Sequence, residues 1–275
     1  MKHPLRRKTP VDMHRMSSWV TTFSGYRHPI TEQRIERWFT QFSSEDRDLA
    51  ARILDCVEFV THVQISTAFK SILSSLDGWH IDEARRRGIW RFVPFSTSAG
   101  ESGDTMLHKF RWANNLNHRK YDELFIYKSE LLQAPLNPQD SVVFVDDFAG
   151  TGQQACKAWD ETIQELLPGN PNAYLILVMA SNCARERIEK ETELMVNPYS
   201  LLSEDDNIFS PRCSHFTPKE KKTILKYCRK ASNQHPRGHG DCGFVVVFAH
   251  NCPNDSIPIL HVFRKGWEGL FRRYD

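Results

Sequence analysis

The sequence lacks several features that would place it in a specialised class of protein. None of its apolar runs approaches the roughly 20 residues that cross a bilayer, and it contains no internal repeat or low-complexity tract. Its net charge is only +2, which gives no strong overall attraction to nucleic acid or acidic surfaces. We therefore expect a globular protein that makes no membrane contact.

A disulfide framework and an export signal are also missing. The seven cysteines are an odd number and are scattered along the chain, which favours reduced thiols. The N-terminal stretch MKHPLRRKTPVDMHRMSS is basic, but no apolar region follows its charges, as a secretory signal requires. Together these two features predict a cytoplasmic protein.

The first part of the chain divides into a basic arm and a helical region. Residues 1–27 are expected to form a loosely ordered arm, either a solvated tail or a contact for a nucleic acid backbone. The cations of this arm are Lys2, Arg6, Arg7, Lys8 and Arg15. Residues 28–88 predict a helical N-terminal subdomain in which no catalytic pattern is evident.

Three helices are expected in this subdomain. Thr31 is a suitable N-cap for EQRIERWFTQF, in which Trp38, Phe39 and Phe42 recur at helical spacing and are expected in the core. A second helix, capped by Ser44, is expected to cover EDRDLAARILDCVEFVTHV. The stretch TAFKSILSSL predicts the third.

Residues 89–275 show the alternation of an α/β domain. The apolar stretches IWRFVPF, SVVFVD, AYLILVMA and GFVVVFAH predict buried strands, and helical patterns separate them. Such an alternation indicates a mainly parallel sheet with helices on both faces, preceded here by the helical N-terminal subdomain. Ligands of these sheets bind beyond the carboxyl ends of the strands.

Two adjacent carboxylates follow one of these strands. Asp146 and Asp147 come directly after the apolar residues 142–145, and a turn of small residues then leads into a helical pattern. Backbone N–H groups at the start of a helix suit a phosphate, and Thr151 adds a hydroxyl. Carboxylates beside a phosphate site suit a sugar phosphate; a plain strand end followed by a helix cap is the alternative.

The stretch VVFVDDFAGTGQQ resembles the phosphoribosyl pyrophosphate-binding motif of type I phosphoribosyltransferases. That motif consists of four apolar residues, two acidic residues, small or apolar residues and then Thr-Gly. The resemblance implies a catalytic role for Asp146 and Asp147, which would hold the ribose hydroxyls and orient the waters of a Mg²⁺ ion. The phosphate-binding residues that it implies are Ala149, Gly150, Thr151, Gly152, Gln153 and Gln154.

Two further segments are similar to parts of this family, although each is also compatible with an ordinary turn. STSAGESG follows a strand and offers pyrophosphate-loop candidates, with Lys109 and Arg111 downstream; these candidates are Ser98, Ala99, Gly100, Ser102 and Gly103. NCPNDS resembles a segment of phosphoribosyltransferase-like proteins of antiphage defence loci such as retrons, and it offers the base-side candidates Asn251, Asn254 and Asp255. The C-terminal stretch GWEGLFRRYD is also similar to those proteins.

The resemblance implies a protein that binds phosphoribosyl pyrophosphate or a nucleotide and acts as the toxin of a bacterial defence system. The basic or Gly-Gly pair and the long catalytic loop of ordinary members are not evident, so two classes of function stay open. One is an enzyme, either a phosphoribosyltransferase or a nucleotide N-glycosidase. The other is a non-catalytic module that senses a nucleotide or binds a partner protein or a reverse transcriptase–nucleic acid complex.

Two other groups of residues could bind a metal or react chemically, but neither matches a known sequence motif. Zinc-compatible side chains gather near the C-terminus, but their spacing contains no CxxC, and we expect packed cysteines and loop histidines instead of a metal site. These side chains are Cys228, His235, His239, Cys242, His250 and Cys252. Cys156 follows the small-residue turn, where a helix N-terminus could lower its pKa. We expect it to pack against the sheet.

Overall fold

The computed structural model describes residues 13–96 and 102–273, and the chain divides into two compact units. The terminal unit combines Met1–His62 with Glu204–Asp275, and the sheet unit is Val63–Ser203. This division differs from the boundary at residue 88 expected from the sequence. The difference arises because the third N-terminal helix belongs with the sheet, whereas the last quarter of the chain belongs with the first two helices.

The sheet unit is an α/β structure with four parallel strands in the order β2-β3-β4-β5. Its main elements are α4 (His62–Ser75), β2 (Trp90–Pro94), α5 (Ser102–Ala113), β3 (Ser141–Ala149), α6 (Gln153–Ala158), β4 (Asn172–Ser181), α7 (Asn182–Glu191) and β5 (Met195–Leu202). The α/β fold class is confirmed. The strand order follows the chain, so this sheet has no point at which the order reverses.

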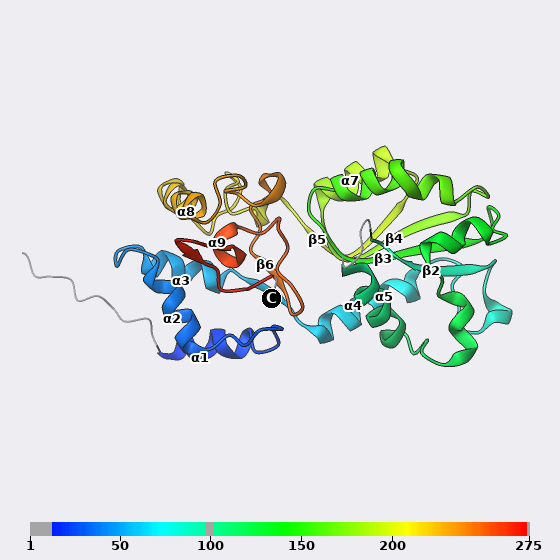
Figure 1. Cartoon of the computed structure of the whole chain (residues 1–275), viewed down its shortest axis with the longest axis horizontal. Helices are drawn as coiled ribbons and strands as arrows, with labels where there is room; N and C mark the ends of the chain where they lie inside the picture. Colours follow the sequence, from blue (N-terminus) through cyan, green and yellow to red (C-terminus); the bar gives the residue numbers. More distant parts are fainter. Residues whose placement is uncertain (1–12, 97–101, 274–275) are drawn as a thin grey trace, which may run out of the picture. The chain divides into compact units, whose positions relative to one another are not determined.

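Helices cover both faces of this sheet, as predicted. On one face, Val142 and Phe144 of β3 share a buried cluster with Ala155 of α6 and Ile188 of α7. On the other face, the ring of Phe92 lies 4.9 Å from that of Phe110 on α5, which in turn lies 5.8 Å from Phe69 on α4. Figure 1 shows α7 on one side of the strands and α4 and α5 on the other.

Strand β5 was not expected from the sequence. It contains Pro198 and is only partly buried, so it lacks the continuous apolar run that marks the other strands. Proline is tolerated in edge strands because it removes a hydrogen bond that an edge does not need. Its place at the edge of the sheet explains both its composition and why no pattern revealed it.

The terminal unit interleaves the two ends of the chain, and Figure 1 shows its blue helices beside orange and red segments. The ring of Phe42 lies 4.6 Å from Tyr227 and 5.4 Å from Trp267, and Phe23 lies 5.0 Å from Phe271. Its elements are α1 (Met13–Thr22), α2 (Glu32–Thr40), α3 (Arg47–Asp55), β1 (Glu58–Val60), α8 (Pro218–Ala231), β6 (Val246–Phe248), α9 (Pro258–His261), β7 (Phe263–Arg264) and β8 (Trp267–Glu268).

The N-terminal helices agree with the sequence in part. Thr31 caps α2 by accepting a hydrogen bond from the backbone N–H of Arg34, and Trp38 and Phe39 are buried, which confirms the first helix. The single helix expected over residues 45–63 is wrong, because α3 ends at Asp55 and β1 follows. The aromatic and β-branched residues of β1 form a parallel pair with β6. The last predicted strand therefore belongs to the terminal unit and not to the larger sheet.

The expected loose arm is wrong for the residues that the structure describes there. Residues 13–22 form α1, and Arg15 is 2.5 Å from the carboxylate of Asp55 and lies over the ring of Trp19. Arg15 is thus a packing residue. Lys2, Arg6, Arg7 and Lys8 lie outside the described residues. None of the helices in the described part of the chain has the length and apolar character needed to span a bilayer.

Candidate functional site

Asp146 and Asp147 lie within β3, beyond the point where its neighbour β2 ends. The pairing of β3 with β2 stops at Val145, whose carbonyl accepts a 2.9 Å hydrogen bond from the N–H of Phe95. The pairing with β4 continues to Ala149. The sequence placed the aspartates after the strand, whereas the strand in fact runs through them. They occupy the carboxyl end of the sheet, with a neighbouring strand on one side only.

The two carboxylates face opposite sides of the sheet. Side chains alternate along a strand, so Asp146 shares the face of Phe144, which packs towards α6 and α7, and Asp147 lies on the α5 face. Asp146 is 8% exposed, and its Oδ1 accepts a 2.9 Å hydrogen bond from the N–H of Asp147. This bond fixes the carboxylate of Asp146 against the strand, while Asp147 remains half-buried.

Two lysines from other elements lie around this end of the sheet. Lys109 of α5 is half-buried; burial lowers its pKa, and the negative charge of Asp147 opposes that shift. Lys128 begins a 3-10 turn, Lys128–Gln133, and its Nζ donates a hydrogen bond to the carbonyl of Ser96, directly after β2. Lys128 has no sequence signal, because its contact joins residues 32 apart. Arg111 is instead held by Asp122 and the carbonyl of Leu116.

The turn of residues 150–152 is anchored to α7. Ser181 Oγ donates a 2.6 Å hydrogen bond to the carbonyl of Gly150 and accepts one of 2.8 Å from the N–H of Ala184. Arg187 donates a 2.9 Å hydrogen bond to the carbonyl of Thr151. In a planar trans peptide the N–H points opposite to the C=O. The N–H groups of Thr151 and Gly152 are therefore directed away from α7.

Gly152 is required by both conformation and space. Its φ of +73° lies in the left-handed region, and a Cβ atom there would be 2.9 Å from the carbonyl oxygen of Ala184. The helix that follows reaches Leu166, close to the expected end, but it changes from α6 to a π-helical turn, Trp159–Ile163, and then to a 3-10 turn. Cys156 is buried and its pKa is raised to about 11 by burial, so it packs as predicted.

The pyrophosphate-loop candidates are only partly described. Ser98, Ala99 and Gly100 lie outside the described residues, and Ser102 and Gly103 form the start of α5. A Cβ atom on Gly103 would lie 2.4 Å from the carbonyl oxygen of Phe95. Glycine at this position therefore lets α5 begin directly against the end of β2, which places Lys109 near the acidic pair.

The base-side candidates lie in the other unit. Asn251, Asn254 and Asp255 belong to the terminal unit, where the carbonyl of Asn254 accepts a 2.8 Å hydrogen bond from the N–H of His239. Asp255 is buried, and its carboxylate, 3.8 Å from Nδ1 of His239, raises the pKa of that histidine. These side chains and the acidic pair are not brought together within one unit.

The described residues contain no group of three or more His, Cys, Asp or Glu side chains positioned to hold a metal ion. This includes the zinc-compatible side chains near the C-terminus. A Mg²⁺ ion commonly uses one or two carboxylates together with waters and substrate phosphates. Asp146 and Asp147 each offer one such carboxylate, on opposite faces of β3, so the chemistry of each fits a magnesium site completed by waters and substrate phosphates.

A surface pocket lies elsewhere on the sheet unit. Its lining includes Tyr174 near the start of β4 and Met195 at the start of β5. These are the amino ends of parallel strands, whereas Asp146 lies near a carboxyl end, so the pocket is at the opposite end of the strands from Asp146. It therefore contributes nothing to the acidic site.

The sequence was compared with known proteins and with models of protein families. No match was found among curated proteins. The family model described as PRTase-CE matches residues 35–273, which include the acidic pair, the turn of residues 150–152 and most of both units. The mainly parallel sheet with helices on both faces agrees with a phosphoribosyltransferase-like fold. The chain therefore belongs to the PRTase-CE family of phosphoribosyltransferase-like proteins.

Proposed function

We propose that the sheet unit binds phosphoribosyl pyrophosphate or a nucleotide at Asp146, Asp147 and the residues 149–154. The observation that carries this proposal is the acidic pair at the open end of β3, followed at once by a turn held rigidly by Ser181 and Arg187. Family membership suggests the same substrate class.

In this proposal, the carboxylates bind the ribose of the ligand and the turn binds its phosphate. The carboxylates of Asp146 and Asp147, on opposite faces of β3, accept hydrogen bonds from the ribose hydroxyls of a sugar that lies across the strand end. The N–H groups of Thr151 and Gly152, directed away from α7, donate to the 5′-phosphate. The hydroxyl of Thr151 and the side chains of Gln153 and Gln154 complete the phosphate site.

The reaction that fits these groups is displacement at the anomeric carbon of the ribose. A nitrogen nucleophile forms the new bond while the carbon–oxygen bond to pyrophosphate breaks, and the pyrophosphate departs with the electron pair. Mg²⁺ held by Asp146 and Asp147 through waters would neutralise charge on the diphosphate. Lys109 and Lys128 add positive charge from the protein, and the remaining residues orient the sugar. With a nucleotide as substrate and water as acceptor, the carbon–nitrogen bond to the base breaks instead, the base leaves with the electron pair, and the same site is an N-glycosidase.

We further propose that this activity makes the chain the toxin of a bacterial antiphage system such as a retron, acting in the cytoplasm. The support is the resemblance of residues 250–256 and of the C-terminal segment to proteins of such loci. In that setting its partner is a defence protein or a reverse transcriptase–nucleic acid complex. Expression of the wild type should slow growth, whereas Asp146→Asn with Asp147→Asn should not.

Calorimetry with phosphoribosyl pyrophosphate and magnesium, combined with mass spectrometry of the products, tests the site directly. The wild type should bind its ligand and, with water or an added amine as acceptor, convert it; the double variant should lose both properties while its circular dichroism is unchanged. Asp205→Asn with Asp206→Asn is the matched control, because it removes two adjacent exposed carboxylates outside the site. Absence of binding by the wild type would contradict the proposal.

Binding without turnover is the second candidate. It is favoured by the sequence, in which the basic or Gly-Gly pair and the long catalytic loop of ordinary phosphoribosyltransferases are not evident. A site that senses a nucleotide needs only the ribose and phosphate contacts. Calorimetric binding with no new product after prolonged incubation would support this candidate over the enzyme.

A further inference from the structure

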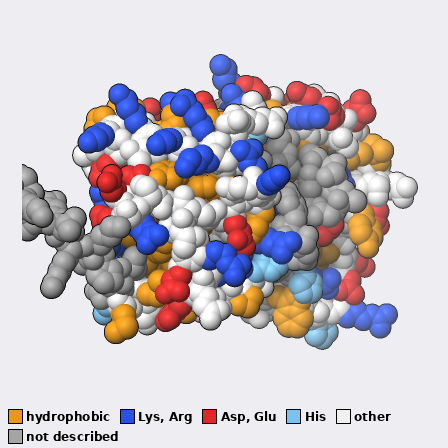
Figure 2. Space-filling model, turned by 60° about the vertical axis from the view of Figure 1, so that its left-hand side comes forward, with side chains coloured by type: hydrophobic (Ala, Val, Ile, Leu, Met, Phe, Trp, Pro, Cys, Tyr) orange, Lys and Arg blue, Asp and Glu red, His pale blue; other side chains and the backbone are white. Residues whose placement is uncertain are grey.

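Helix α8 in the terminal unit carries a row of cations along its exposed face. Lys219, Lys222, Lys226 and Arg229 recur at spacings of three and four residues, which places them on the same side of the helix, and all four are exposed. Lys230 lies beside them. Figure 2 shows Lys and Arg side chains gathered across the upper left of one face of the molecule.

The helix separates these cations from its other charges. Lys221 points inward, and its Nζ donates hydrogen bonds of 2.6 Å and 2.7 Å to the carbonyls of Ser210 and Cys213. Glu220 is the single acidic residue of α8, and its carboxylate is occupied by Arg52 at 2.5 Å and by Thr217. The exposed side of the helix is therefore left without a negative charge of its own.

The hairpin of β7 and β8 extends this positive surface. Arg264 donates a 2.6 Å hydrogen bond to the carbonyl of Lys230, the neighbouring Lys265 is exposed, and both lie in the β7–β8 hairpin segment. We call this surface the basic face; it consists of Lys219, Lys222, Lys226, Arg229, Lys230, Arg264 and Lys265. Within residues 13–96 and 102–273, no acidic side chain forms an ion pair with any of these seven.

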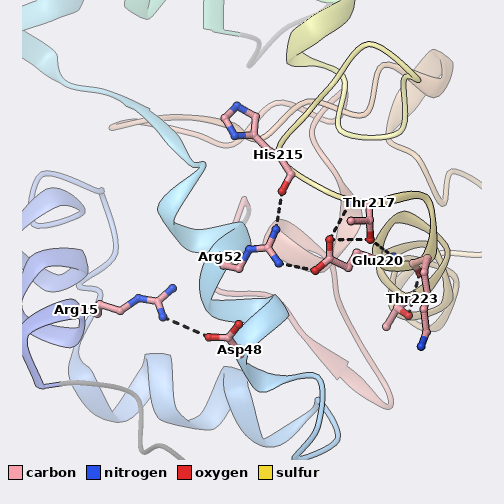
Figure 3. A network of polar contacts seen from close by, with 8 residues as sticks. Arg15, Asp48, Arg52, His215, Thr217, Glu220 and Thr223 are labelled. Carbon is pink, nitrogen blue, oxygen red and sulfur yellow. Dashed lines mark hydrogen bonds and ion pairs between the residues drawn. The ribbon is translucent and has the colours of Figure 1, made fainter.

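The basic face is built on a rigid support. Thr217 and Glu220 form a capping box at the start of α8, and Arg52 of α3 also donates to the carbonyl of His215, as Figure 3 shows. Tyr227 packs against Phe42 on the inner side of the helix. The helix backbone that carries these lysines is thus fixed before any partner arrives, which reduces the entropy cost of binding.

We propose that the basic face binds the phosphate backbone of a nucleic acid. The rise of an α-helix places Lys219 and Arg229 about 15 Å apart along the axis, a length that spans about four to five phosphates of one duplex strand. A row of exposed cations with no acid between them releases counterions from that backbone. Since the cations contact phosphates only, binding is independent of base sequence.

The apolar side chains of α8 argue against a membrane as the partner. A helix that lies on a bilayer inserts an apolar face into the headgroup boundary. In α8 the apolar stripe of Ile224, Tyr227, Cys228 and Ala231 is buried in the protein core and faces away from the lysines. The basic face therefore attracts its partner by charge alone. A phosphate backbone can bind it without any apolar side chain being inserted.

The test is fluorescence anisotropy of labelled DNA and RNA duplexes of about 20 base pairs with the full chain, at salt from about 50 to 200 mM. The variant changes Lys219, Lys222, Lys226 and Arg229 to Gln. It should bind at least about tenfold more weakly at the lowest salt, and its slope of log K against log [salt] should fall by about two to four. The two duplexes distinguish DNA from RNA as the preferred source of phosphate.

The matched control removes four exposed cations from the sheet unit, by changing Arg119, Lys120, Lys157 and Lys190 to Gln. It keeps the same net charge as the test variant, and its affinity should stay within about twofold of the wild type. Equal weakening in both variants, no effect in the test variant, or binding to anionic vesicles alone would overturn the proposal. Thermal melts of both variants check that α8 and its surroundings remain folded.

Discussion

Ser181 joins β4 to the turn after the acidic pair, because its hydroxyl donates to the carbonyl of Gly150 and also caps α7 through the N–H of Ala184. One side chain therefore sets both the start of a helix and the direction of a peptide in the proposed phosphate site. The geometry of the turn depends on α7 even though α7 contributes no proposed ligand contact of its own.

Replacing Ser181 with alanine should weaken ligand binding and lower stability. Loss of a helix cap costs about 1 kcal/mol, and the carbonyl of Gly150 loses its buried donor. Calorimetry should show an affinity for phosphoribosyl pyrophosphate that is lower by about tenfold. The control Thr31→Ala removes a helix cap in the terminal unit and should lower stability alone. Equal binding by Ser181→Ala and the wild type would contradict the role of this contact.

Gly152→Ala should lower the stability of the sheet unit by more than the cost of placing alanine at a positive φ. Alanine at positive φ costs about 1 kcal/mol, and its Cβ would in addition meet the carbonyl oxygen of Ala184 at 2.9 Å. Gly266→Ala is a matched control, because Gly266 has a φ of +90° with no atom within 4 Å of an added Cβ. Urea unfolding of both variants measures the difference, which should be at least about 1 kcal/mol.

Lys128→Met should weaken binding of inorganic pyrophosphate while leaving the fold intact. The side chain of Lys128 brings a positive charge to the carbonyl of Ser96 at the end of β2, and methionine keeps most of its apolar stem. We expect a loss of affinity of about threefold to thirtyfold by calorimetry. Lys120→Met, an exposed lysine eight residues earlier, is the control. An unchanged dissociation constant for Lys128→Met would remove this residue from the site.

His261 should make the terminal unit sensitive to mild acid. Burial and, to a smaller extent, the charge of Arg273 lower its pKa from 6.5 to about 3, and the neutral ring contacts the carbonyl of Ser256 at 3.1 Å. Because the folded pKa is depressed, the stabilisation is complete above the unfolded pKa of 6.5 and is lost as the pH falls towards 3. Between pH 6.5 and 5 the loss should be about 2 kcal/mol.

Hydrogen exchange followed peptide by peptide can measure this loss in the terminal unit alone. His261→Gln retains a donor but cannot take up a proton, so its stability should be flatter over the same range. Glu220 does not interfere, because its pKa is lowered to about 2, first by the N–H of Thr217 and then by Arg52. Its contribution is lost only below its unfolded pKa of 4.5. An equal pH slope in the variant and the wild type would exclude His261.

The features predicted correctly from the sequence are those encoded in contiguous residues. The apolar run before Asp146 and the turn that leads into the next helix are local, and so are the spacing of Trp38 and Phe39 and the cap at Thr31. Each of these patterns specifies backbone structure within a few residues. The α/β class followed from the alternation of such segments.

The features that were missed depend on contacts between distant residues. Strand β1 is a strand because β6 pairs with it, and these elements are nearly 190 residues apart in the chain. Lys128 reaches Ser96 across a loop, and β5 is held at an edge where its partly exposed residues give no periodic signal. No local pattern indicates that the two ends of the chain share one core, so the boundary between the units could not be placed.

The shared core of the terminal unit has a consequence for how the protein is made. Trp38 of α2 hydrogen bonds to the carbonyl of Ile259, and Tyr26 to that of Arg272, so the first helices gain these partners only when residues near 270 have been synthesised. The sheet unit, Val63–Ser203, is contiguous, so all of its strands have been synthesised before the last quarter of the chain and it can fold earlier. During elongation, the aromatic side chains of α1 and α2 therefore stay exposed until the C-terminal segment has been made. We expect chaperones to bind there during translation.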